Sequence, residues 1–216
     1  MIKILVSLSL IAVFLINPCM GMHDYSQQDA IQYASVASLA YCTPERILEG
    51  ACWDATKLVE SYGIVPMYSG TIMMGSFSTA VYAITRLDEE EKIIVGWSCT
   101  RNDVQLLTEG YASFMNVKLA EYDLHEVQEG ARTVKYFDKF YDLIRDEYKS
   151  DLNKTLEEYP EYELVITGHS LGGALSVQAT VDCILSENVT EDKLFVYTYG
   201  APRVGNYKFT KIIGDR

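Results

Sequence analysis

The chain has 216 residues and carries 18 Lys and Arg against 30 Asp and Glu, a net charge of −12 at pH 7. This length corresponds to one domain that can bury a substantial core. A surface this acidic repels nucleic acid and anionic membranes, so charge-driven binders of either kind are excluded.

The N-terminus has the pattern of a secretory signal peptide. Lys3 precedes a largely apolar run over residues 4–16, which is short for a membrane span, and Cys19 and Gly21 are small residues at −3 and −1 of a cleavage after Gly21. No later run approaches membrane length. We predict a signal peptide over residues 1–21 and a secreted or lumenal protein; an N-terminal anchor helix is the alternative.

The mature chain, residues 22–216, contains four cysteines, and an exported chain would hold them in an oxidising compartment. Cys42 and Cys52 close a short loop and are the predicted disulfide, the alternative being two free thiols. Cys99 and Cys183 are not expected to join each other, and Cys183 is expected to be buried in a helix.

Two segments match the N-glycosylation sequon. They begin at Asn153 and Asn188, each followed two residues later by Thr. Both asparagines are candidate acceptors, although many such sequons are never used.

Helical and extended patterns alternate in the first half of the mature chain. Ser26 is a candidate N-cap, and small and apolar residues then suit a helix through Tyr41. Residues 43–78 lack a clear pattern and are predicted to be loop with short elements of uncertain type. β-Branched runs at 79–84 and 92–97 flank a charged turn and predict two strands.

The second half repeats this alternation after residues 101–124, which mix polar and apolar residues without a period. Apolar side chains at three-to-four spacing predict an amphipathic helix over 132–149. A strand at 162–167, a helix at 171–185 and a strand at 194–199 follow. Strands that alternate with long helices favour a parallel or mixed sheet in one α/β domain, with the two helices on its faces.

A glycine–serine motif lies between the last predicted helix and the strand before it. Residues 168–172 read Gly-His-Ser-Leu-Gly, a G-x-S-x-G pattern in a strand–turn–helix context. This order is typical of the nucleophile elbow of α/β-hydrolases, where glycines let strand and helix approach around a strained serine. The following helix would direct its N–H groups at a developing oxyanion. Ser170 is the predicted nucleophile; a chance Gly/Ser-rich turn is the alternative.

Two longer segments resemble the signatures of the class 3, fungal-type lipases. They are residues 165–176 (VITGHSLGGALS) and 197–206 (YTYGAPRVGN), and weaker similarity over 33–42 and in the strand pair extends the match to roughly residues 30–216. The resemblance implies an α/β-hydrolase fold, with a mixed, mostly parallel sheet and flanking helices.

The resemblance also implies roles for individual residues. Ser170 would attack an ester carbonyl, and the backbone N–H of Leu171 would be one oxyanion donor. Thr100 holds the position of the second donor, although the Arg-Gly pair that precedes it in the family is Ser98-Cys99 here. His169 stands where the family ordinarily has a histidine of structural importance, and it is not expected to act as the base.

The implied activity is hydrolysis of acylglycerols or related esters, at a lipid–water interface in some cases. Apolar residues within 101–124 would line a lid over the site or pack on the core. No His, Cys or acidic cluster has metal-ligand spacing, so neither a metal nor a cofactor is predicted. The expected partner is a lipid or ester substrate, and no nucleic acid.

The sequence shows no complete catalytic triad. An α/β-hydrolase triad runs Ser, then Asp or Glu, then His, yet no histidine follows Ser170, and Asp182, Asp192 and Asp215 do not hold the position of the family's acid. The chain is interpreted as a fragment that lacks the C-terminal part of the fold, and as written is expected to be inactive. Two alternatives stay open: a lipase-like protein that binds lipid or a partner without hydrolysis, and a site completed in another way, for example through His125.

Overall fold

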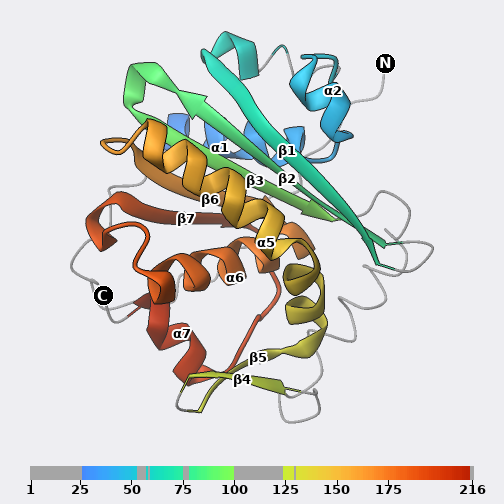
Figure 1. Ribbon diagram of the computed structural model, residues 1–216, viewed down its shortest axis with the longest axis vertical. Helices are drawn as coiled ribbons and strands as arrows, with labels where there is room; N and C mark the ends of the chain where they lie inside the picture. Colours follow the sequence, from blue (N-terminus) through green and yellow to red (C-terminus); the bar gives the residue numbers. More distant parts are fainter. Residues whose placement is uncertain are drawn as a thin grey trace.

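A five-stranded sheet forms the centre of the computed structural model, which describes residues 26–52, 57, 59–74, 78–99, 124–128 and 130–214. The strands lie in the order β1-β2-β3-β6-β7 (Figure 1). The first three are paired antiparallel, and β3, β6 and β7 are parallel. Their bounds are β1 Ile64–Met74, β2 Ser78–Leu87, β3 Lys92–Cys99, β6 Glu163–His169 and β7 Leu194–Tyr199.

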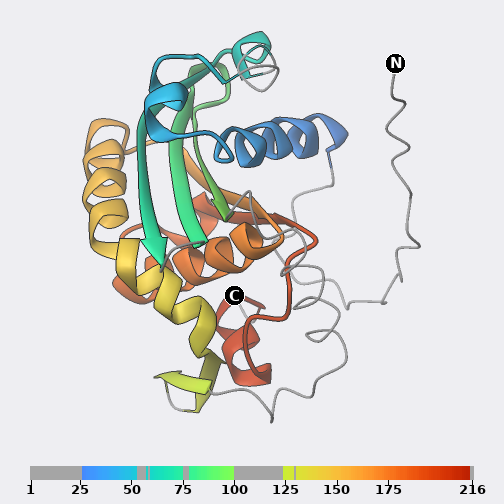
Figure 2. The same cartoon turned by 90° about the vertical axis from the view of Figure 1, so that its right-hand side faces the viewer.

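Helices cover both faces of this sheet and make a three-layer structure. Figures 1 and 2 show α1 on one face and the long α5 with α6 on the other. The described helices and the small hairpin are α1 Gln27–Leu39, α2 Pro44–Leu48, β4 Leu124–Gln128, β5 Ala131–Val134, α5 Lys135–Glu158, α6 Leu171–Ser186 and α7 Tyr207–Gly214; short 3-10 turns cover Asp88–Glu90 and Glu191–Lys193.

The period of two along each strand divides the core between the two faces. Ile93 and Val95 of β3 belong to the hydrophobic cluster that contains α5 and α6, whereas Ile94 between them belongs to the cluster with α1 and α2. Successive side chains of a strand point to opposite faces, so one strand fills both cores. This explains why β3 and β6 consist almost entirely of buried residues.

Most of the predicted elements are confirmed. The four predicted strands lie in one sheet, and α6 matches the helix predicted over 171–185 to within one residue. The side chain of Ser26 accepts a hydrogen bond from the backbone N–H of Asp29 (3.2 Å), as an N-cap does, although α1 ends at Leu39 rather than at Tyr41.

The helix predicted over 132–149 is wrong at both ends. Residues 131–134 form β5, because they pair with β4 and because Val134 donates a backbone hydrogen bond to the carbonyl of Val204 (2.9 Å). The helix α5 then begins at Lys135 and continues to Glu158, since Leu152 and Thr155 extend its buried face.

Residues 43–78, predicted to be loop with short elements of uncertain type, contain more structure than that prediction allows. The short helix α2 agrees with it, but the eleven-residue edge strand β1 does not. Pro66 and Gly70 obscure the strand pattern in the sequence, but Pro66 lies at an irregularity where the register with β2 shifts. Proline is tolerated at such positions of an edge strand because no ladder hydrogen bond is lost there.

Candidate active site

The predicted nucleophile lies at a sharp turn between the sheet and a helix. β6 ends at His169, Ser170 has φ 55° and ψ −122°, and α6 begins at Leu171. A positive φ is costly for a residue with a Cβ, so such a conformation persists only where its surroundings impose it. The half-buried Ser170 is therefore held in the strained geometry expected of a nucleophile elbow.

The two glycines of the motif make this turn possible by their lack of a side chain. A Cβ on Gly168 would lie 2.4 Å from the carbonyl oxygen of Gly172, and a Cβ on Gly172 would lie 2.2 Å from the backbone oxygen of Trp97. Both contacts are with backbone, which cannot move aside as a flexible side chain can. The spacing of the motif thus lets α6 pack directly against β6 and β3.

Backbone and side-chain hydrogen bonds fix the base of the elbow. The N–H of Ser170 donates to the carbonyl of Tyr199 at the end of β7 (2.9 Å), and the Tyr199 hydroxyl donates to the carbonyl of Ala30 in α1. The turn is thereby connected to β7 and, through Tyr199, to α1 on the other face of the sheet.

The first turn of α6 offers hydrogen-bond donors beside Ser170. Leu171 is the first residue of this sixteen-residue helix, and its N–H has no acceptor within the helix because the first four N–H groups of any helix have none. The positive end of the helix dipole lies at the same place. An oxygen anion formed next to Ser170 would meet both.

The side chain of His169 contacts Tyr41. The Tyr41 hydroxyl lies 3.1 Å from Nδ1 of His169, and their ring centroids are 6.5 Å apart. The exposed imidazole is thus engaged by the chain that follows α1.

The carboxylates that follow Ser170 have partners of their own. Asp182 accepts hydrogen bonds from the Tyr141 hydroxyl (2.9 Å) and from Nζ of Lys149, and so ties α6 to α5. Asp192 is exposed, and hydrogen bonds from Thr190 and from the backbone lower its pKa. His125 lies in β4, within the two-stranded sheet apart from the central one.

Several predicted residues lie outside the described part of the chain. They are the predicted signal peptide over residues 1–21, Thr100, the candidate lid up to residue 123, and Asp215. Among the described residues, no group of three or more His, Cys, Asp or Glu side chains could hold a metal ion. No described helix has the length and apolar character needed to cross a membrane.

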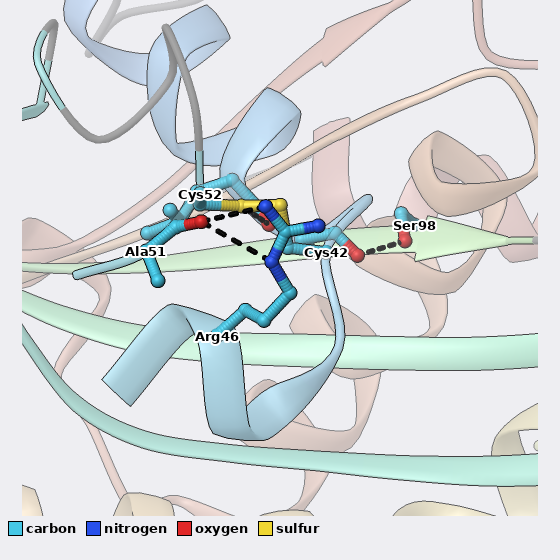
Figure 3. The surroundings of a disulfide bond; sticks show 7 residues. Cys42, Arg46, Ala51, Cys52 and Ser98 are labelled. Atoms are coloured by element: carbon cyan, nitrogen blue, oxygen red, sulfur yellow. Dashed lines mark hydrogen bonds between the residues drawn. A yellow bond between two sulfur atoms is a disulfide. The ribbon is translucent and has the colours of Figure 1, made fainter. Parts of the chain in front are cut away.

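The predicted disulfide is present, and Figure 3 shows its surroundings. Cys42 is bonded to Cys52, with Cα atoms 6.1 Å apart. Within this loop, Nε and Nη2 of Arg46 donate to the carbonyl of Ala51 at 3.1 and 2.7 Å. Cys183 is buried as predicted, and burial raises the pKa of its thiol to about 12.

The two sequon asparagines lie side by side but in different settings. Nδ2 of the exposed Asn188 donates to Oδ1 of Asn153 (3.2 Å). Asn153 lies inside α5, where the hydroxyl of Thr155 is buried and donates to the Asp151 carbonyl. Asn188 instead follows the end of α6.

The chain is similar to known proteins. The family model described as Lipase (class 3) matches residues 94–216. The chain belongs to the class 3 lipase family. A lipase of Rhizopus niveus is 27% identical over 186 residues, which are 84% of this chain and 44% of that protein. The secreted mono- and diacylglycerol lipase A of Penicillium cyclopium is 39% identical over 71 residues, 33% of this chain and 22% of the relative.

Solved lipases have the same fold. The crystal structure of a lipase from Rhizopus microsporus var. chinensis superposes with a TM-score of 0.70 at 25% identity, covering 87% of this chain and 62% of that one. The predicted α/β-hydrolase fold is thereby confirmed. This class 3 lipase chain nevertheless spans less than half the length of the Rhizopus niveus relative.

Proposed function

We propose that the natural full-length protein is an ester hydrolase that forms an acyl-enzyme on Ser170. The observation that carries the proposal is the strained backbone of Ser170, φ 55°, at the tip of a glycine-enclosed turn that leads into α6. Glu91 and Glu187 also have positive φ, but their ψ values of 48° and 27° lie in the ordinary left-handed region, whereas the ψ of Ser170 is −122°. Membership of the class 3 lipase family supports the same assignment.

The proposed chemistry follows from the atoms around the elbow. Oγ of Ser170 attacks the ester carbonyl and loses its proton to a base, and the carbonyl oxygen becomes an oxyanion. The N–H of Leu171 and the dipole of α6 stabilise that charge. Collapse of the intermediate breaks the ester C–O bond, and the leaving alkoxide takes the proton from the base and departs as the alcohol. Water then hydrolyses the acyl-enzyme to the carboxylic acid and free Ser170. Thr100 remains the candidate for a second donor.

The base that would take the proton of Ser170 is not among the residues that follow it in this sequence. His169 is engaged by Tyr41, and residues 171–216 contain no histidine, whereas the fold places the acid and the histidine after the serine. A serine without a positioned base is a weak nucleophile. Residues 22–216 alone are therefore expected to turn over esters little or not at all.

Acylglycerols are the proposed substrates, and export is the proposed destination. A relative that is a secreted mono- and diacylglycerol lipase supports both, as does the signal-peptide pattern over residues 1–21. In an exported protein Asn188 is the better glycan acceptor, because the Asn153 sequon lies in a helix with its threonine hydroxyl buried.

The test compares Ser170→Ala with the unchanged protein in two chains, the natural full-length protein and residues 22–216. In the full-length protein we expect the rate on a soluble short-chain ester to fall on the order of 10³-fold or more. In residues 22–216 the substitution should change almost nothing. Ser150→Ala, at an exposed serine of α5, is the matched control in both.

Two results would contradict the proposal in different ways. A full-length protein that binds acylglycerol emulsions but hydrolyses no ester would be a lipid-binding relative of the lipases. Strong turnover by residues 22–216, abolished by Ser170→Ala, would mean that an upstream group such as His125 supplies the base.

A further inference from the structure

The hydrogen-bonded ladder between β3 and β6 stops just before the elbow. Its last pair is Trp97 with Gly168. Beyond that pair each strand continues only with its other neighbour: Ser98 pairs with Val81 of β2, and His169 pairs with Tyr199 of β7. The two strands therefore separate at the end of the sheet that carries Ser170, and no backbone ladder sets the distance between their last residues.

Two consecutive residues after α1 span this separation. The carbonyl of Ala40 accepts a hydrogen bond from the hydroxyl of Ser98 on the β3 side, and the hydroxyl of Tyr41 contacts Nδ1 of His169 on the β6 side (3.1 Å). Ala40 is the C-cap of α1, where carbonyl groups lack partners within the helix. Ser98 thus supplies a donor to a carbonyl that has no partner within its own helix, and both residues are buried.

The same segment is fixed from two other directions. On one side, α1 lies directly on β3, where a Cβ on Gly96 would come within 2.5 Å of the Val36 carbonyl oxygen. On the other side, the next residue, Cys42, is joined to Cys52, and Figure 3 shows this bond beside the hydrogen bond of Ser98. Because residues 40–42 are held by α1 on one side and by the disulfide on the other, their contacts can fix the ends of β3 and β6.

We propose that Tyr41 and Ser98 are positioning residues that bridge the separated ends of β3 and β6 and so fix Ser170 and the start of α6 relative to β3. The inference rests on the proposed hydrolase function, for which the spacing of these ends matters. Oxyanion donors act within a few tenths of an ångström, and a displacement of about 1 Å can cost up to 10²-fold in rate.

The test uses Tyr41→Phe, Ser98→Ala and the double variant in the natural full-length protein, assayed on a soluble short-chain ester. Each single change should lower kcat on the order of 10-fold and leave KM within about 3-fold, because the substrate is still bound. Because breaking either end releases the same bridge, the double variant should lose about as much as one single variant, not the product of both. Tyr207→Phe, at an exposed tyrosine of α7, is the control.

A second measurement separates this proposal from the proposed function. Amide hydrogen exchange in peptides that cover 96–99 and 168–171 should become faster in both single variants and unchanged in Tyr207→Phe. Normal kcat with unchanged exchange would overturn the bridge and leave the hydrolase intact. Absence of esterase activity in every form, with faster exchange in the two variants, would overturn the hydrolase function and leave the bridge. Independent, multiplicative losses in the double variant would also contradict a single bridge.

Discussion

The two faces of the sheet differ in what their side chains do. Toward α5 and α6, large aromatic rings fill the core: Trp97 lies 4.8 Å from Tyr148 and 5.7 Å from Tyr82, measured between ring centroids. Toward α1 the buried side chains are mostly aliphatic, with Tyr33 as the one buried aromatic ring among the described residues of that cluster, and the end of this face bears the contacts of Ser98 and His169 with the residues after α1. The first face carries the largest of the described buried side chains, and the second bears the contacts proposed to fix the strand ends.

Polar groups on the aromatic face serve the packing of helices. The Tyr82 hydroxyl donates to Asp151 (2.7 Å), and the Tyr141 hydroxyl donates to Asp182. Burial, followed by the carboxylates of Asp151 and Glu147, raises the pKa of Tyr82 well above its ordinary value, so the hydroxyl stays a donor at any physiological pH. These tyrosines therefore fasten α5 to the sheet and to α6 and are not available for proton transfer.

The sharpest test of the comparison uses two consecutive residues of β3. Trp97 is fully buried on the aromatic face and Ser98 is buried on the α1 face. We expect Trp97→Ala to lower the free energy of unfolding by about 3–5 kcal/mol, since it leaves a large cavity. Ser98→Ala should cost about 1–2 kcal/mol, the loss of one buried hydrogen bond. Urea unfolding measures both, and equal costs would mean that the faces do not differ in this way.

The next largest effect concerns the disulfide on the α1 face. Replacing Cys42 and Cys52 together by alanine should destabilise the protein by roughly 2–3 kcal/mol, because the unfolded chain gains the freedom of an open loop. The midpoint of urea unfolding measures this loss. Reduction of the unchanged protein is the control and should give the same shift; a shift in only one of the two experiments would point to a change in packing instead.

The structure could be predicted from the sequence in the regions where the local pattern and the tertiary structure agree. Residues 162–199 combine a β-branched run, a glycine motif and an apolar helix, so strand, elbow and helix could be placed to within about two residues. Cys42 and Cys52 could be paired because their loop is short. Each of these features depends on neighbours in the sequence.

The sequence was insufficient where distant segments decide the structure. β1 contains a proline that becomes acceptable only at an edge and an irregular register, and residues 131–134 became a strand because of pairing with β4 and contact with Val204. The contacts of Ser98 with Ala40 and of Tyr41 with His169 could not be predicted for the same reason. They join residues that are 58 and 128 positions apart in the sequence. The sequence signal near these contacts is the Ser98-Cys99 pair, which stands where the family has Arg-Gly.

The smallest predicted effect is a pH dependence at the contact between α1 and the turn before β3. Oε1 of Glu90 accepts from Nε2 of Gln32 in α1 (2.9 Å), and Oε2 accepts from Nζ of Lys92 (2.6 Å). Burial raises the pKa of Glu90, but the hydrogen bonds from Lys92 and Gln32 outweigh it and hold the pKa below its ordinary value of 4.5. A carboxylate with a lowered pKa stabilises the fold above its unfolded pKa, and this stabilisation is lost as pH falls below about 4.5 toward the folded value.

Glu90→Gln should therefore destabilise the protein near neutral pH by less than about 1 kcal/mol, because the group is partly exposed. The difference from the unchanged protein should shrink steadily as the pH is lowered through 4.5, since both forms then carry an uncharged side chain at residue 90. Urea unfolding at a series of pH values measures this, with the exposed neighbour Glu89→Gln as the control for removing one surface charge. A difference that stays constant, or grows on acidification, would show that the contact with α1 depends on shape and not on the charge of Glu90.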